Sequence, residues 1–129
     1  MPKAARGDPL RPIVVFALFQ GKTPTLLKMA LDTGATYTVI PPKAALAIGC
    51  DPSRAKRRIQ MVTASGVEHV PVVVIPKITC LGVEVAKLEA VCHDLPPSMV
   101  EGLLGLNFLI HFKPFRRFAK AIGVAHGSI

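Results

Sequence analysis

The sequence predicts a small, mostly β domain with one or two short helices. Half of the 129 residues are hydrophobic, Trp is absent and aromatic residues make up 5%, so the core must consist of Val, Ile, Leu and Ala. Short β-branched apolar runs alternate with Gly, Pro and small polar residues, which is typical of strands and tight turns. We expect one domain over residues 1–129, with residues 1–11 as a flexible arm. Residues 115–124, within a C-terminal segment from 113 to 129, are compatible with either an edge strand or a helix.

The first half of the chain contains three predicted strands and one helix. The first run is apolar throughout and is followed by a turn at Gln20-Gly21-Lys22, while the third run is stopped by two prolines. Pro41-Pro42 and Gly49 are suited to begin and end a short helix. The predicted elements are strands over residues 13–19, 25–31 and 36–40 and a helix over residues 43–48.

The second half predicts two hairpins and a short helix. The small residues Ala64, Ser65 and Gly66 lie between two apolar runs, which indicates a hairpin tip. Gly82 lies at the centre of a second hairpin. The predicted elements are strands over residues 57–63, 67–75, 78–81, 83–85 and 87–93 and a helix of barely two turns over residues 106–112.

The most informative motif is Asp32-Thr33-Gly34-Ala35, which lies between two predicted strands. A tight, glycine-containing loop at this place would project one carboxylate from the sheet, with backbone N–H groups nearby to bind it. A single aspartate that only caps a turn would show the same tripeptide. Far downstream, however, the segment Gly102-Leu103-Leu104-Gly105 places two apolar residues before a glycine and a short helix.

These two motifs together, in this order, resemble the retropepsin-like aspartic proteases, and the resemblance covers about residues 12–112. It implies a small, closed, barrel-like acid protease fold with Asp32 as the catalytic residue. Thr33 would place its hydroxyl on the loop of a second protomer, Gly34 would let the substrate backbone approach, and Ala35 would complete the loop. Leu103, Leu104 and Gly105 would cross behind the loop and support it.

The chain departs from the retroviral enzymes at two positions. Those enzymes carry an acid after Asp-Thr-Gly-Ala and an arginine after the later glycine, and the two form an ion pair. Here the corresponding residues are Thr36 and Leu106, so both partners are missing together and no buried charge is left unpaired. The pattern is closer to the cellular and bacterial members of the family.

Hydrolysis of a peptide by carboxylates requires two of them around one water, and this chain has only one Asp-Thr-Gly loop. An active enzyme must therefore be a homodimer in which two Asp32 residues meet at a two-fold axis. The hairpin over residues 61–68, with Thr63, Ala64, Ser65 and Gly66 at its tip, is predicted to be the flap over an extended peptide with apolar side chains. The alternative is an inactive protease-fold module for dimerisation or peptide binding.

Composition bears on other functions and on the compartment. The formal charge is +8, but the basic clusters lack interleaved aromatic residues, so we favour a solvated surface over nucleic-acid binding. Three cysteines without a Cys-x-x-Cys pair indicate buried thiols in a reducing compartment, and the cytoplasm is expected. No apolar stretch approaches the ~20 residues of a membrane helix. The histidines lack metal-ligand spacing, and we expect neither a metal nor a cofactor.

Overall fold

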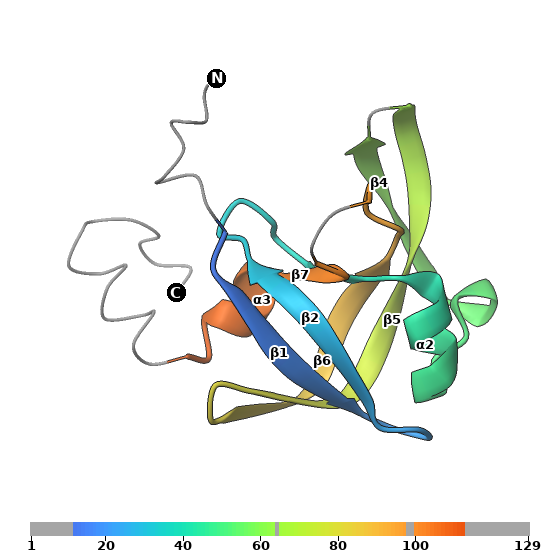
Figure 1. Cartoon of the computed structure of the whole chain (residues 1–129). Coiled ribbons are helices and arrows are strands. Elements are labelled where there is room, and N and C mark those ends of the chain that lie inside the picture. The colour runs from blue at the N-terminus through green and yellow to red at the C-terminus, as the bar shows by residue number, and fades with distance from the viewer. Residues whose placement is uncertain (1–11, 64, 98–99, 113–129) are drawn as a thin grey trace.

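The computed structural model of the protein describes residues 12–63, 65–97 and 100–112. The predictions for the arm, for the C-terminal segment and for Ala64 lie outside these residues. Most of the described chain is in strands, and the helices are short (Figure 1). In chain order the elements are β1 (Val14–Gln20), β2 (Thr25–Leu31), β3 (Thr38–Ile40), α2 (Pro42–Ile48), the 3-10 helix η1 (Pro52–Arg54), β4 (Arg57–Thr63), β5 (Gly66–Cys80), β6 (Val83–Cys92), β7 (Gly102–Leu104) and α3 (Leu106–Leu109).

The strands form a closed barrel with one additional strand. The sheet order is β1-β2-β7-β3-β6-β5-β4, and a further pairing between β1 and β5 closes the ring. β4 lies outside this ring and pairs with the first part of β5, so the two strands project from the barrel as a long hairpin (Figure 1). The predicted fold class, mostly β and barrel-like with few helices, is confirmed.

The short strand β7 is inserted between the two strands that flank the Asp32 loop. It runs parallel to β2, with Leu31 opposite Leu104, and antiparallel to β3, with Val39 opposite Leu103. β2 and β3 are consecutive along the chain, yet each of them pairs with β7. The loop between β2 and β3 must therefore pass over the end of β7, which brings the two motifs of the sequence together.

Alternate residues of the strands face opposite sides of the barrel wall and form two separate apolar clusters. The larger cluster fills the barrel and includes Phe19, Met29, Ile75, Leu104 and Phe108, none of which is accessible to solvent. The smaller cluster lies on the outer face of the same strands. It consists of Val39, Val70, Val72 and Val91, with the partly buried Tyr37, Ile59, Met61, Leu95 and Leu103 packed against them. We call this second set the outer cluster.

The ends of some elements differ from the prediction. β5 continues through Pro76, where we expected a break, because its neighbour on one side changes there from β4 to β1 and no ladder N–H is needed from the proline. We also predicted two separate strands over residues 83–85 and 87–93. In the structure β6 continues across this predicted break, and Lys87 adopts a positive φ of 53°.

Two predicted elements are shorter in the structure. The third strand begins at Thr38 instead of at residue 36, because the carbonyls of Ala35 and Thr36 accept bonds from the start of α3. The predicted helix over residues 106–112 ends at Leu109, since the N–H groups of His111 and Phe112 bond to carbonyls only three residues back.

Candidate active site

Asp32 follows the last residue of β2 and begins a tight turn. Its own N–H donates to the carbonyl of Leu104, at 3.0 Å, so β7 holds the start of the loop. The N–H of Gly34 donates to Asp32 Oδ1 at 2.8 Å, and the N–H of Ala35 donates to the Asp32 carbonyl at 3.2 Å. The loop therefore orients one oxygen of the carboxylate through one backbone donor, the N–H of Gly34, while Thr33 and Gly34 remain exposed on its outside.

Gly105 lies directly behind this loop and is buried. A β-carbon on Gly105 would collide with the carbonyl oxygen of Tyr37 and would stand 2.7 Å from that of Ala35. The N–H of the next residue, Leu106, donates to the Ala35 carbonyl at 2.8 Å. The requirement for glycine at position 105 thus comes from close backbone contact between this segment and the loop.

A side-chain bracket that the sequence analysis missed fixes the far end of the loop. Asn107 Oδ1 accepts bonds from the N–H of Thr38, at 3.0 Å, and from its hydroxyl, at 2.9 Å, while Asn107 Nδ2 donates to the Glu89 carbonyl at 2.6 Å. Thr38 Oγ1 in turn accepts from the N–H of Gly105 at 3.2 Å. One amide therefore joins β3, β6 and the start of α3.

A signal for this bracket was present in the sequence. In the structure Thr38 is completely buried, and among the described residues its side chain is the polar one in the buried set. The sequence signal lies at its partner. Asn107 is a polar residue within an otherwise apolar run, and a buried amide requires several partners. The partner of Asn107 could not be identified from the sequence, because Thr38 is 69 residues away.

The positions of the missing retroviral ion pair lie at this same junction. Thr36 is exposed and Leu106 is half-buried, and the N–H of Asn107 donates to the Thr36 carbonyl at 3.2 Å. Backbone bonds between the loop and α3 therefore connect the two segments that an ion pair connects in the retroviral enzymes.

The predicted flap is the end of the β4–β5 hairpin, which projects from the same end of the barrel as the Asp32 loop (Figure 1). Gly66 has a φ of +117° and no atom within 4 Å of the place where a β-carbon would stand, which confirms the predicted positive φ. Thr63 Oγ1 lies 3.0 Å from both the Gly66 carbonyl and Glu68 Oε2 and accepts a bond from the N–H of Ser65. Thr63, Ser65 and Gly66 are thus joined by their own bonds, and Ser65 and Gly66 are exposed to solvent.

The outer cluster lies between this hairpin and the Asp32 loop. It contains Ile59 and Met61 of β4 together with Val39 of β3 and Leu103 of β7. Arg57 Nη2 donates to Tyr37 Oη and to Glu89 Oε1, both at 3.0 Å, and joins the root of the hairpin to the segment after the loop. This apolar surface beneath the hairpin was not predicted.

The remaining acids of the described chain have other partners or lie elsewhere. Asp51 caps η1 through Ser53, Glu84 pairs with Lys77, and Glu101 Oε1 accepts from the N–H of Lys28. Bonds with Ser53 lower the pKa of Asp51. Glu89 and Glu68 are engaged as described above.

The three cysteines are free thiols, and none lies in a group that could hold a metal within residues 12–63, 65–97 and 100–112. Burial raises the pKa of Cys80 and Cys50, and it raises that of Cys92 to about 11 with a further contribution from Cys50. A raised pKa makes a thiol a poor nucleophile at neutral pH. The described helices are too short to cross a membrane.

Comparisons with known proteins agree with this geometry. A model of the family described as "gag-polyprotein putative aspartyl protease" matches residues 17–111. Among solved structures, a retropepsin-like aspartic protease from Rickettsia conorii is similar in fold, with a TM-score of 0.60 and 21% sequence identity, over 78% of this chain and 79% of that one. No curated protein matches the chain. The matched region contains the Asp32 loop, β7 and Gly105, and the chain belongs to the retropepsin-like aspartic protease family.

Proposed function

We propose that the protein is a homodimeric aspartic endopeptidase in which the Asp32 residues of two protomers activate one water molecule. The observation that carries this proposal is the braced carboxylate. Asp32 is held by backbone bonds from β7 and within its own turn, and Gly105 supports the loop from behind.

The proposed chemistry needs a shared proton. Two carboxylates at hydrogen-bond distance hold one proton between them, because like charges so close cannot both ionise. The ionised Asp32 takes a proton from water, whose oxygen bonds to the peptide carbon, while the protonated partner donates to the carbonyl oxygen. The tetrahedral intermediate then collapses, the C–N bond breaks and a proton passes to the leaving nitrogen.

The dimer supplies the second carboxylate. Among the described residues, Asp51 caps η1 and Glu84 and Glu89 form ion pairs, whereas Asp32 is the acid of the chain that lies in an Asp-Thr-Gly loop. Thr33 and Gly34 are exposed beside it, where a second copy of the loop could approach. The hydroxyl of Thr33 forms no hydrogen bond within the described residues, which leaves it available to the partner's loop.

The proposed substrate is an extended peptide with apolar side chains near the cleaved bond. The outer cluster presents the partly buried Leu103 and Tyr37 beside the loop, and Ile59 and Met61 on the hairpin above them. Val62 and Val67, opposite each other near the hairpin tip, are 83% and 62% exposed. Apolar groups that face water in the free chain gain free energy when a ligand covers them. Closure of the hairpin tip at Thr63, Ala64, Ser65 and Gly66 would cover the peptide and exclude water.

The direct test is cleavage of a peptide library by the purified protein, with Asp32→Asn as the matched control. We expect cleavage that pepstatin inhibits and that the substitution abolishes without altering the circular dichroism spectrum. Full activity of the Asp32→Asn protein would exclude the proposed mechanism. Tight, apolar peptide binding without any cleavage by the wild-type protein would indicate a binding module of the same fold.

A further inference from the structure

A single row of paired residues connects the Asp32 loop with the root of the hairpin. Five strand pairings place these residues side by side across the sheet, and alternation puts the side chains from Leu103 onward on the outer face of the barrel. The row begins two residues before Asp32 and runs Ala30, Leu103, Val39, Val91, Val72, Arg57.

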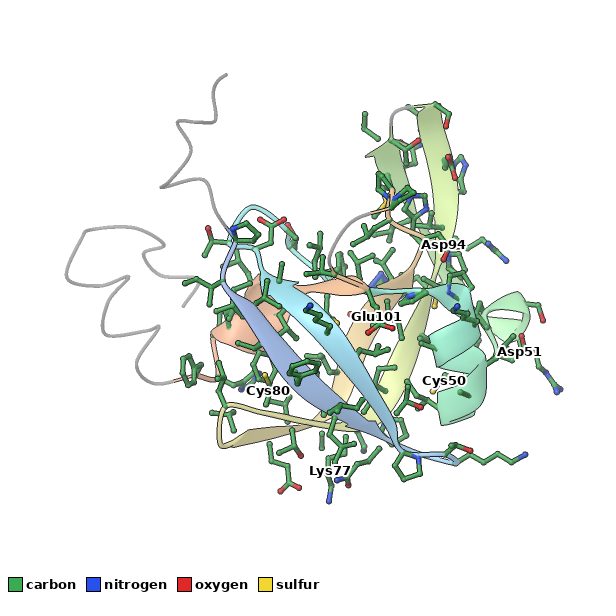
Figure 2. The ribbon with its side chains drawn as sticks, viewed as in Figure 1. Cys50, Asp51, Lys77, Cys80, Asp94 and Glu101 are labelled. Atoms are coloured by element: carbon green, nitrogen blue, oxygen red, sulfur yellow. The ribbon has the colours of Figure 1, made fainter. Side chains whose placement is uncertain are left out.

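A hollow of about 690 Å³ continues this surface beyond Arg57. Val72 and Arg57 line it, and so do Val74 and Glu89, which are paired with each other one step along the same face of β5 and β6. The opposite wall is formed by the chain between α2 and β4, where Figure 2 shows Cys50 and Asp51 beyond the end of the helix. The hollow therefore adjoins the outer cluster on the same side of the sheet, where Val39, Val91 and Val72 are themselves covered by partly buried side chains.

The hollow is cationic. Its lining includes Arg54, Lys56 and Arg57, against the acids Asp51 and Glu89. Both acids are engaged, because Asp51 accepts bonds from Ser53 and Glu89 forms its ion pair with Arg57. The ion pairs among the described residues are Arg57–Glu89 and Lys77–Glu84, so Arg54 and Lys56 have none there.

The floor of the hollow is apolar. Val72 is buried, whereas Val74 is 53% exposed although it stands in the middle of a strand. β5 has no strand partner on this side between Val72 and Lys77, and the Cys50 thiol donates to the Val74 carbonyl at 3.4 Å. A ligand with a carboxylate and an aliphatic stem, such as a glutamate side chain, matches this combination of surfaces.

Distance relates the hollow to the cleaved bond. From β7 to β4 there are four strand spacings of about 4.8 Å, or roughly 19 Å along the sheet, and an extended peptide advances about 3.3 Å per residue. Because the sheet curves, a peptide that starts at Asp32 and follows the outer cluster reaches the hollow after about four to six residues. We propose that the hollow is a distal subsite that selects an acidic side chain of the substrate, an inference that rests on the proposed function.

The test uses peptides with one apolar core and Glu, Gln or Lys at the positions four, five and six residues from the cleaved bond. A single exposed charge pair contributes little free energy. The two pairs that a glutamate carboxylate would form with Arg54 and Lys56 should together favour Glu over Gln by about fivefold in kcat/KM at low salt. This preference should decline in 0.5 M salt, since the charges are accessible to solvent. A ratio of one at every position in the wild-type protein would overturn the inference and leave the proposed function intact.

A charge-reversed variant locates the effect. In Arg54→Glu/Lys56→Glu the preference should turn from Glu to Lys. The matched control, Lys43→Glu/Arg58→Glu, changes the net charge equally at two exposed residues that do not line the hollow, and it should keep the preference for Glu. The same loss of preference in both variants would indicate only the net charge of the protein and would overturn the proposed subsite.

A binding experiment separates this inference from the proposed function. Fluorescence anisotropy of labelled Glu and Gln peptides on the Asp32→Asn protein measures the preference without cleavage. A preference for Glu that is lost only in the Arg54→Glu/Lys56→Glu background supports the subsite even if the wild-type protein cuts nothing. Equal binding of both peptides would contradict the subsite. The subsite would also be contradicted if a single-stranded oligonucleotide were the only competitor that displaced the Glu peptide.

Discussion

The two faces of the barrel wall, made by the same strands, differ in how completely they are covered. On β7, Leu104 points into the barrel and is inaccessible to solvent, whereas its neighbour Leu103 belongs to the partly exposed outer cluster. On β3, Ile40 likewise belongs to the inner cluster and Val39 to the outer one, although both of these side chains are buried. The inner face is closed by the other strands, and the outer face is covered only in part by the hairpin. Adjacent residues of one strand therefore serve the stability of the fold and the proposed contact with substrate.

The largest expected difference between the faces is that between two neighbouring leucines. Leu104→Ala should lower the free energy of unfolding by about 3–4 kcal/mol, because it leaves a cavity in a closed core. Leu103→Ala should cost about 1 kcal/mol, since its side chain is only partly buried. Urea unfolding measures both, and cleavage of peptides that differ in apolar side chains shows whether Leu103 contacts substrate. Equal losses of stability would contradict the division between the two faces.

The next expected effect concerns the Asn107 bracket on the inner side. Asn107→Ala should lower the free energy of unfolding by about 2–3 kcal/mol, because the N–H and hydroxyl of Thr38 lose their acceptor in a buried place. A double-mutant cycle with Thr38→Val should show a coupling energy of at least about 0.5 kcal/mol. Additive losses would mean that the two side chains act independently.

The interior thiols predict a dependence of stability on alkaline pH. The pKa of Cys92 is raised in the folded protein from 9.0 to about 11, so the folded state favours the protonated thiol. The resulting stabilisation is complete below pH 9 and is lost as the pH rises toward 11, with an order of magnitude of about 2 kcal/mol. Unfolding of wild-type protein and Cys92→Val at pH 8 and pH 11 measures it. The variant should lose less stability over this interval than the wild-type protein, and an equal loss would contradict the account.

On the outer side, the hairpin tip should affect activity more than stability. Gly66→Val places a branched side chain at a φ of +117° and should restrict the opening and closing of the hairpin. We expect at least about a tenfold loss of kcat/KM, equivalent to ~1.4 kcal/mol, with a change in unfolding free energy within about 1 kcal/mol. Ser65→Ala is the matched control at the same tip. Full activity of Gly66→Val would mean that another segment covers the site.

The parts of the site that could be predicted are those with a local signal. Asp-Thr-Gly-Ala specifies its own turn, and Gly105 could be recognised because it follows two apolar residues downstream of that motif. The strands over residues 25–31 and 57–63 have the predicted bounds, since their β-branched and apolar residues are bordered by turn signals.

The remaining features depend on residues far apart in the sequence. Nothing in Gly102-Leu103-Leu104 is periodic, and this segment becomes a strand because β2 and β3 lie on either side of it. The contact between Asn107 and Thr38 and the cluster of Arg57, Tyr37 and Glu89 likewise join separate strands. Pro76 was misleading for the opposite reason, because a local break signal was tolerated where β5 changes its neighbour.

The central claim, that one active site needs Asp32 from two protomers, is tested most directly by mixing subunits. Wild-type protein is equilibrated with increasing amounts of Asp32→Asn protein, and cleavage of one peptide is measured at a constant amount of wild-type chain. If each site is shared, inactive heterodimers form and the activity falls toward zero as the variant reaches large excess. Activity that stays constant during this titration, while the two proteins are shown to exchange subunits, would contradict the account.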